Sequence, residues 1–320
     1  MNAAIPARGA LGAALQLALP TRTALEVPLA PKVAFRIGGP AEALVRPHDP
    51  AELATALAIA QQHGAPVTVL GTGSNVLVGD GGIRGLVLRL AGELADFHVG
   101  FDHGGAAEIE VGAGALNAPL VSMLLHLGLV GVEFLATIPG TFGGALIMNA
   151  GAHGGEIGPF VEEVGVVRID GTVERRLGRD CAFGYRSSGF RPGEILTDAR
   201  LRVPRGDAAS AKQHLEEMRL RRRSSQPHDQ PNAGSIFKNP PGDFAGRLIE
   251  ACGLKGRAVG AAQISELHAN FIVNRGGALA KDVVALADLA AAQVMERFGI
   301  GLEWEVRRIG EHNSSGDPGN

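Results

Sequence analysis

Apolar residues three or four positions apart predict helices in several parts of the chain. The best-marked helix follows Asp49, which suits an N-cap, and has Pro50 at its first position and Glu52 three residues past the cap. Gly64 ends it. Further helices are predicted at residues 117–127, with Asn117 as the cap, and at 208–223, 243–252 and 281–298.

Alternating or continuous apolar runs predict the strands. Residues 108–111 alternate as in a strand with one buried face, and Asp170-Gly171 predicts the turn of a hairpin. The other predicted strands cover residues 67–70, 86–90, 164–169, 172–176, 195–203 and 302–309. Helices and strands are mixed, with both hairpins and crossovers, so the pattern predicts an α+β fold. Residues 204–206 suit a domain boundary.

Composition narrows the class of protein. The chain has 320 residues, enough for about two domains, with 45% apolar residues and a net charge of -3. No polyanion partner is indicated, and the basic run at 219–223 is interpreted as a solvated helix end rather than a nucleic-acid site. No apolar run reaches the length of a membrane span, and residues 9–19 are interpreted as an amphipathic helix or an extension rather than a secretory leader. Two cysteines and no metal-ligand spacing among the histidines predict a reduced, cytoplasmic protein without a metal site.

Glycine is enriched, at 46 residues of 320, and is concentrated in three segments. These are 71–75, 138–156 and 233–240. Bare backbone N–H groups suit a diphosphate, although such segments can equally be tight turns. Val76 stands where the dinucleotide fingerprint needs its third glycine, and no loop ends in Gly-Lys-Ser/Thr, so a Rossmann dehydrogenase and a P-loop enzyme are unsupported.

Seven segments in order resemble the UDP-N-acetylenolpyruvoylglucosamine reductase (MurB) family over about residues 25–310. They read FRIGGPAE from Phe35, GTGSNVLVGDGG from Gly71, EFLATIPGTFGGALIMNAGAHGGEI from Glu133, FGYRSSGF from Phe183, NAGSIFKNP from Asn232, LIEACGLKGRAVGAAQISELHANFIVN from Leu248 and FGIGLEWEVRRIG from Phe298.

The resemblance implies a fold and a cofactor. The expected α+β organisation is an N-terminal extension at 1–22 and an FAD-binding PCMH-type region at 23–206. That region has two small subdomains, about 23–90 and 91–206. A C-terminal substrate-binding domain at 207–310 and a disordered tail at 311–320 follow. Non-covalent FAD is expected at Gly71, Thr72, Gly73, Ser74, Asn75, Ile138, Pro139, Gly140, Thr141, Gly143, Gly144 and Ala145.

The resemblance also implies catalytic residues, namely Arg186, Ser235 and Glu305. Hydride added to the methylene carbon of an enolpyruvyl group pushes negative charge onto the adjacent carboxylate, which a guanidinium stabilises. Ser235 would protonate C2 of the resulting enolate. Without the resemblance, these residues read as an ordinary Tyr-Arg pair, a turn serine and a solvent-facing glutamate. Substrate binding is expected at Tyr185, Lys238, Asn239 and Lys255, and the role of His268 is open.

The expected activity is NADPH-dependent reduction of UDP-N-acetylglucosamine enolpyruvate to UDP-N-acetylmuramate in peptidoglycan biosynthesis, by a cytoplasmic monomer with no nucleic-acid or membrane partner. Two rivals remain open. One is a flavin oxidase on the same FAD fold, and the other is a nucleotide-sugar-binding protein without catalysis. Ala34, Thr137, Phe142 and Trp304 depart from the family pattern, and none of them replaces a residue assigned to chemistry.

Overall fold

The computed structural model describes residues 9–312 and divides into two compact units. Unit 1 comprises the residues up to 25 together with 43–71 and 85–222, and unit 2 comprises 26–42, 72–84 and the residues from 223 onward. Two early segments of the chain therefore fold with its C-terminal part. The domain limits expected from the sequence stay a prediction, and parts of the extension (1–8) and of the tail (313–320) lie outside the described residues.

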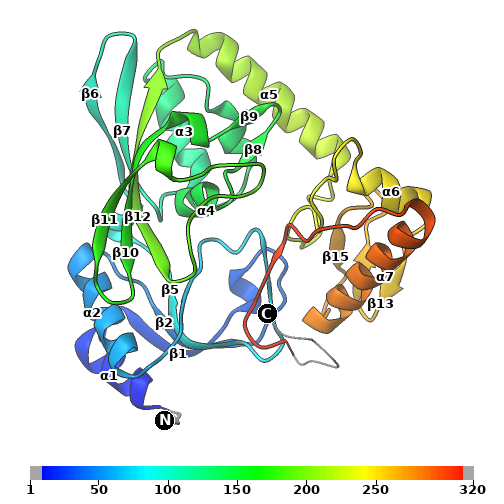
Figure 1. The fold of residues 1–320 in the computed structure, drawn as a ribbon, viewed down its shortest axis with the longest axis horizontal. Coiled ribbons are helices and arrows are strands. Elements are labelled where there is room, and N and C mark those ends of the chain that lie inside the picture. The colour runs from blue at the N-terminus through cyan, green and yellow to red at the C-terminus, as the bar shows by residue number, and fades with distance from the viewer. Residues whose placement is uncertain (1–8, 313–320) are drawn as a thin grey trace. The chain divides into compact units, whose positions relative to one another are not determined.

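Two helices and a small sheet form the first layer of unit 1 (Figure 1). The sheet has the order β1 (Thr23–Pro28), β2 (Pro40–Val45), β5 (Ile83–Leu88) and β3 (Val67–Val69), and the limits of the units fall inside its first three strands. Helices α1 (Ala10–Ala18) and α2 (Pro50–Gln62) share one apolar core with it, which includes Leu11, Leu15, Leu53, Leu57 and Leu86. Residues 10–18 are thus a packed amphipathic helix.

The predicted N-terminus of α2 is confirmed. The Asp49 side chain accepts a hydrogen bond from the Glu52 N–H at 2.8 Å, and the Glu52 carboxylate accepts one from the His48 N–H at 2.7 Å. These bonds satisfy backbone donors that have no partner inside the helix. Gly64 follows the helix with φ of 58°, a conformation that glycine adopts without steric cost.

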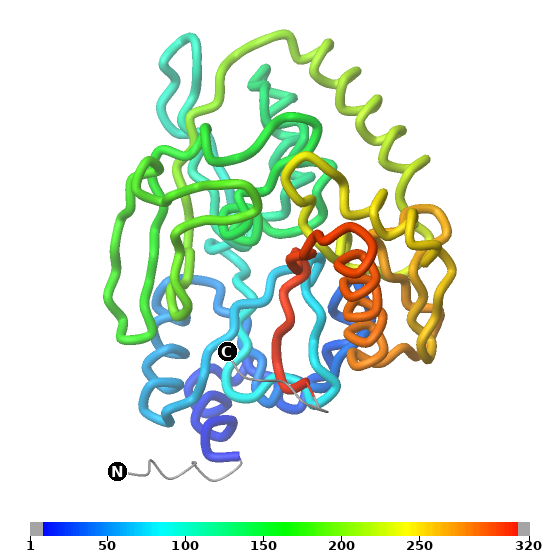
Figure 2. The backbone as a smooth tube through the Cα atoms, turned by 45° about the vertical axis from the view of Figure 1, so that its right-hand side comes forward, coloured from blue at the N-terminus to red at the C-terminus, as the bar shows by residue number. Residues whose placement is uncertain are grey.

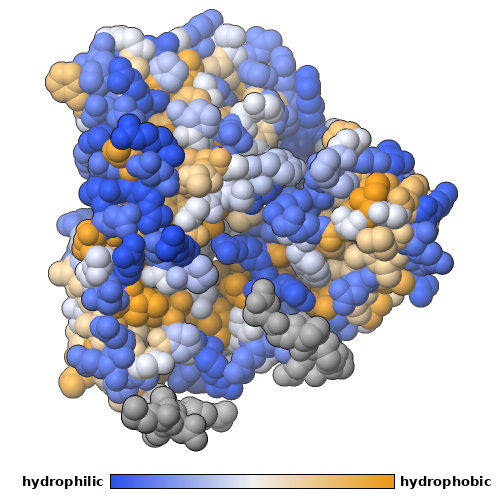
Figure 3. Space-filling model, viewed as in Figure 1, coloured by the Kyte–Doolittle hydropathy of each residue, from blue (hydrophilic) through white to orange (hydrophobic). Residues whose placement is uncertain are grey.

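An antiparallel sheet of five strands forms the rest of unit 1, in the order β11-β10-β12-β7-β6. Its strands are β6 (Phe97–Asp102), β7 (Ala106–Gly112), β10 (Val161–Arg168), β11 (Val173–Leu177) and β12 (Glu194–Pro204). Helices α3 (Asn117–His126) and α4 (Phe142–Ile147) contribute to the core over this sheet, and α5 (Ala208–Ser225) adds Leu215 and Met218. The hairpin predicted at Asp170-Gly171 is confirmed, and Phe101 near the end of the edge strand β6 is exposed. Hydrophilic residues cover much of the face shown in Figure 3, with apolar residues between them.

Unit 2 packs two helices against a three-stranded sheet. The sheet is β13 (Ala258–Val259), β14 (Ala262–Ile264) and β15 (Ile272–Asn274), and the helices are α6 (Ala245–Ala251) and α7 (Ala280–Phe298). A parallel pair joins β16 (Arg307–Ile309) to β4 (Val76–Val78), so the red C-terminal strand runs beside a cyan segment in Figure 2. The Asp80 carboxylate accepts hydrogen bonds from the backbone N–H groups of Ala280 and Lys281, the first two residues of α7. These bonds satisfy donors that have no partner inside the helix.

Four local predictions were wrong in detail. Asn117 lies inside the first turn of α3 and makes no cap, because its side chain donates to the Ile138 carbonyl instead. Helix α6 begins at Ala245, two residues later than predicted, since Asp243 bonds the Phe244 N–H and Arg247. The strand predicted at 302–309 is regular only from Arg307, and the one at 67–70 is shorter and only half-buried.

No helix within residues 9–312 is long and apolar enough to span a bilayer. In the same part of the chain Cys181 and Cys252 are free thiols.

Candidate active site

A tight turn in unit 1 presents Tyr185 and Arg186. Gly184 and Ser187 exchange both backbone hydrogen bonds, at 3.0 and 3.1 Å, so the two residues between them form the tip. Arg186 has φ of 52°, a conformation that costs energy for any residue other than glycine. Tyr185 is 57% exposed, and the Arg186 guanidinium lies 5.5 Å from the centre of its ring. A half-buried arginine beside an exposed tyrosine on a strained turn is the kind of local feature that functional sites carry.

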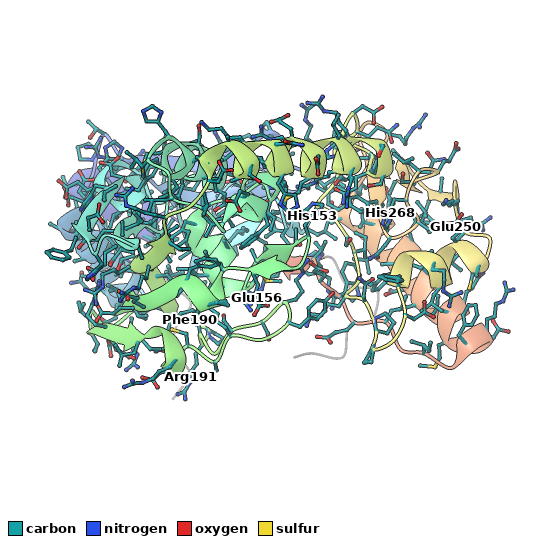
Figure 4. The ribbon with its side chains drawn as sticks, turned by 90° about the horizontal axis from the view of Figure 1, so that it is seen from above. His153, Glu156, Phe190, Arg191, Glu250 and His268 are labelled. Atoms are coloured by element: carbon teal, nitrogen blue, oxygen red, sulfur yellow. The ribbon has the colours of Figure 1, made fainter. Side chains whose placement is uncertain are left out.

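A buried asparagine holds this turn against the end of the long glycine segment. Asn149 is 1% exposed; its amide donates to the Gly184 carbonyl at 3.0 Å and accepts from the Gly158 N–H at 2.9 Å. Arg186 Nη1 donates to the Gly151 carbonyl at 2.8 Å. Gly151 lies on β8 (Gly151–Ala152), which pairs with β9 (Gly155–Glu156) in a hairpin on which Figure 4 labels His153 and Glu156. Asn149 was not among the residues predicted from the sequence, where its signal is a polar residue between apolar runs.

The segment 138–145 and Gly71 come together within unit 1. A Cβ on Gly71 would lie 2.4 Å from Thr141 Oγ1, so only glycine fits against this threonine. Gly144 has open space around it, since a Cβ there would meet only Thr141 Oγ1, at 3.6 Å. Asn117 anchors the segment by donating to the Ile138 and Gly140 carbonyls. Bare, fixed backbone of this kind fits a diphosphate, so the residues present here fit FAD.

We expect Gly71→Ala to lower the FAD content of the purified protein. The new methyl group would force the Thr141 side chain to move, and overpacking of this kind costs about 1–3 kcal/mol. A loss of this size in the free energy of binding lowers the affinity for FAD roughly tenfold or more. The ratio of flavin to protein absorbance after dialysis measures the FAD content. Gly100→Ala is the control, because a Cβ there makes ordinary contacts; equal flavin in both variants would contradict the assignment.

The rest of the first glycine cluster lies in unit 2 and is tied to the segment that carries Glu305. The Asn75 side-chain amide donates to the Glu305 carbonyl at 3.2 Å, and the Arg307 N–H donates to the Asn75 carbonyl at 3.1 Å. Gly73 has φ of 69° and packs against Val33, where a Cβ would lie 2.5 Å from its side chain. A predicted cofactor residue and a predicted catalytic residue are therefore adjacent.

Ser235 and Glu305 lie on neighbouring extended segments of unit 2. The Glu305 N–H donates to the Ile236 carbonyl at 2.8 Å, and Phe237 forms an isolated bridge with Trp304. On its other side the Ser235 segment pairs with Phe271. Both side chains are half-buried. The structure thus brings together two residues that are 70 positions apart and that the sequence analysis assigned to catalysis.

The three predicted substrate residues of unit 2 have protein partners. Lys238 Nζ pairs with Glu303 Oε1 at 2.5 Å. Asn239 accepts from the Ala245 N–H at the start of α6, at 3.1 Å. Lys255 pairs with Glu250 at 2.7 Å. These pairs are partly exposed, and exposed ion pairs are weak, so a substrate phosphate can compete for the lysines.

His268, whose role the sequence left open, is a structural acceptor in unit 2. Its Nδ1 accepts from the Asn270 N–H at 3.2 Å, and its ring meets Phe271 edge-on with 4.8 Å between centres. Burial, with a smaller contribution from Lys255, lowers the pKa of His268 below its usual value, which favours the neutral ring that can accept this bond. Figure 4 labels it together with Glu250 of α6.

The candidate residues thus form one group in each unit. Unit 1 holds Gly71, the segment 138–145, Tyr185 and Arg186, and unit 2 holds the segment 72–75, Ser235, Lys238, Asn239, Lys255 and Glu305. Within residues 9–312 no group of His, Cys, Asp or Glu side chains could hold a metal ion.

Comparison with known proteins finds matches along most of the chain. Residues 41–176 match the family model described as an FAD binding domain, and residues 226–309 match the C-terminal domain of UDP-N-acetylenolpyruvoylglucosamine reductase. A reductase of that name from Myxococcus xanthus is 46% identical over 89% of this chain and 91% of its own length, and one from Rubrobacter xylanophilus is 44% identical over 89% and 94%. The crystal structure of the Thermus caldophilus enzyme covers 90% of this chain and 98% of its own, with a TM-score of 0.75 and 39% identity.

Proposed function

Because the chain belongs to the UDP-N-acetylenolpyruvoylglucosamine reductase family, we propose that it reduces UDP-N-acetylglucosamine enolpyruvate to UDP-N-acetylmuramate with NADPH in peptidoglycan biosynthesis. The observation that carries the proposal is the pairing of the Ser235 segment with the Glu305 segment. This pairing makes neighbours of the residue proposed to protonate the substrate, Ser235, and the residue proposed to assist it, Glu305. A cytoplasmic location and a monomer stay predictions.

The cofactor residues divide between the two units. Gly71 and the segment 138–145 offer bare backbone that would hold the diphosphate of FAD, and the segment 72–75 would contribute Ser74 and Asn75. FAD, when bound, accepts a hydride from NADPH and supplies one to the substrate. The residues around it would orient the ring and exclude water from the reacting atoms.

Arg186 handles the charge that the reaction creates. When hydride reaches the methylene carbon, the π electrons of the C=C bond move toward C2 and its carboxylate, which gives an enolate. A guanidinium grips a carboxylate through two parallel hydrogen bonds and gains strength as that charge grows. The strained turn and the Asn149 amide hold Arg186 in place before the substrate arrives. Tyr185 lies over the same guanidinium and would contact the substrate.

Ser235 gives its hydroxyl proton to C2 of the enolate, which completes addition of one hydride and one proton across the double bond. A serine hydroxyl is a weak acid, but a carbanion-like enolate is a strong base, so the transfer is favourable at hydrogen-bond distance. Glu305 on the neighbouring segment acts together with Arg186 on the enolate intermediate. Lys238, Asn239 and Lys255 would bind the UDP-sugar diphosphate.

One spectroscopic experiment tests the proposed function. The visible spectrum of the purified protein is recorded without oxygen, then with NADPH, then with the enolpyruvyl substrate. We expect a flavin band that bleaches with NADPH and returns with the substrate, with UDP-N-acetylmuramate as the product. A band that returns only with oxygen would indicate the oxidase instead. A protein that binds UDP-sugar but takes up no added FAD would indicate a non-catalytic binding protein.

A further inference from the structure

A buried asparagine, Asn270, forms hydrogen bonds with the segment that carries Ser235, on the side opposite Glu305. Asn270 is 3% exposed and lies between β14 and β15. Its Oδ1 accepts from the Phe237 N–H at 3.0 Å, and its Nδ2 donates to the Phe237 carbonyl at 2.8 Å. Its own backbone carbonyl accepts from the Ile236 N–H at 2.8 Å. Three hydrogen bonds from one residue therefore hold two successive residues after Ser235.

The side chain takes the place of a strand at this point. In a regular sheet, a backbone N–H and C=O on the neighbouring strand would bond both groups of Phe237. Here the pairing ends after a single bridge between Ser235 and Phe271, because residues 268–271 form a turn, and the Asn270 amide supplies the missing donor and acceptor. An amide is the side-chain group that offers both in one plane, and a carboxylate offers acceptors only.

The bonds of Asn270 also help to fix the register of the Ser235 segment against the Glu305 segment. On the far side of the same segment, the Ile236 carbonyl accepts from the Glu305 N–H, and the Lys238 N–H donates to the Glu303 carbonyl, each at 2.8 Å. Residues 235–238 are thus held between Asn270 on one side and residues 303–305 on the other. Without the amide only one edge of the segment keeps its full set of bonds, so the register of Ser235 against Glu305 would loosen.

We propose that Asn270 is a positioning residue that holds Ser235 at the distance needed to protonate the substrate. This inference rests on the proposed function, in which Ser235 is the acid, and it concerns proton delivery alone. The hydrogen bonds of Asn270 join it to Ile236, Phe237 and His268, none of which is assigned to FAD, so we expect reduction of the flavin by NADPH to be independent of it.

The test uses Asn270→Asp in the full chain with FAD bound. The substitution keeps the side chain's size and the acceptor for the Phe237 N–H, but it replaces the donor by an oxygen that repels the Phe237 carbonyl. We expect flavin reduction by NADPH at the wild-type rate and reoxidation by the enolpyruvyl substrate slowed about tenfold or more, since a loosened acid loses part of the 10²–10⁴-fold that general acid catalysis supplies. The solvent deuterium isotope effect on reoxidation should rise, because proton transfer becomes rate-limiting.

Lowering the pH should restore reoxidation in Asn270→Asp, because the new carboxyl becomes protonated. The neutral acid again offers one donor and one acceptor, so the ratio of variant to wild-type reoxidation rate should increase toward one as the pH falls. Both proteins carry the same titratable groups on the neighbouring segments, so the ratio of rates isolates the new carboxyl: His268, Lys255, Glu250, Arg247, Lys238, Glu303 and Glu305.

Asn274→Asp is the matched control. Asn274 is a buried amide of the same unit; it donates to the Phe35 and Arg36 carbonyls and accepts from the N–H groups of Gly276 and Ala278, so its side chain bonds a different segment. We expect this variant to lose stability but to reoxidise normally. Emission from Trp304, the single tryptophan, which contacts Phe237, should change only in the Asn270 variant.

Each outcome decides the inference. Normal reoxidation in Asn270→Asp, or equal slowing in both variants, would overturn it. If the buried carboxylate prevents folding, Asn270→Ala takes its place and the same two half-reactions decide. A wild-type protein that forms no UDP-N-acetylmuramate would instead refute the proposed function, whatever the variants do.

Discussion

Replacing Ser235 by alanine is expected to nearly abolish formation of UDP-N-acetylmuramate while NADPH still reduces the bound flavin. The variant lacks the proton that C2 of the enolate must receive, and loss of a general acid costs about 10²–10⁴-fold in rate. The segment keeps its backbone pairing, since its bonds with Asn270, Phe271 and Glu305 involve main-chain groups of residues 235–238. Stopped-flow absorbance without oxygen measures the two half-reactions separately.

Ser265→Ala separates this effect from general damage to unit 2. Ser265 is 4% exposed, and its hydroxyl accepts from the N–H groups of Leu267 and His268, so its role is structural. We expect a lower melting temperature and unchanged half-reactions in this variant. If Ser235→Ala lost both half-reactions equally, or kept its reoxidation rate, Ser235 would not be the acid.

Local sequence patterns correctly predicted those helices and turns that are determined by residues close together in the sequence. The capped start of α2, the Asp170-Gly171 hairpin and the apolar face of the long helix α7 depend on residues within a few positions of one another. The mixed, α+β character of the fold followed from their order. Asn117 shows where such reasoning stops, since asparagine at a helix start usually caps it, but here the amide bonds the Ile138 carbonyl, 21 residues later.

Long-range pairing could not be predicted from periodicity. The segments 26–42 and 72–84 fold with the C-terminal part of the chain, and β16 pairs with β4 more than 200 residues before it. Residues 303–305 look like one strand with 307–309 in sequence. Instead, they leave the Ser235 segment after a single bridge before β16 begins, so the regular strand is short.

The candidate site was predicted residue by residue through its resemblance to a family, not from physical pattern. Arg186 and Ser235 have no local signature that separates them from an ordinary turn arginine and turn serine. The supporting asparagines, Asn149 and Asn270, were missed because their function exists only in three dimensions: each amide bonds the backbone of a segment more than 30 residues away. Polar residues in apolar surroundings, such as the asparagines of Met-Asn-Ala and Ala-Asn-Phe, are the signal that could have indicated them.

Replacing Arg186 is expected to give the second large loss. Arg186→Asn removes the guanidinium but suits the turn, because asparagine tolerates the left-handed conformation at φ of 52° better than most residues. Without the guanidinium, charge grows on the substrate carboxylate with no paired donor, and removal of one such stabilising group costs about 10²–10³-fold. We expect reoxidation of the flavin by the enolpyruvyl substrate to slow by that factor, while NADPH reduces the flavin normally.

Arg186→Lys distinguishes charge from geometry. Lysine keeps the positive charge but cannot form two parallel hydrogen bonds with a carboxylate. A rate between those of wild type and Arg186→Asn would show that both the charge and the fork-shaped donor pattern contribute. A rate equal to wild type in either variant would remove Arg186 from the reaction. Equal loss of both half-reactions would mean that the turn serves the structure of unit 1 through its bond to Gly151 rather than the chemistry of the substrate.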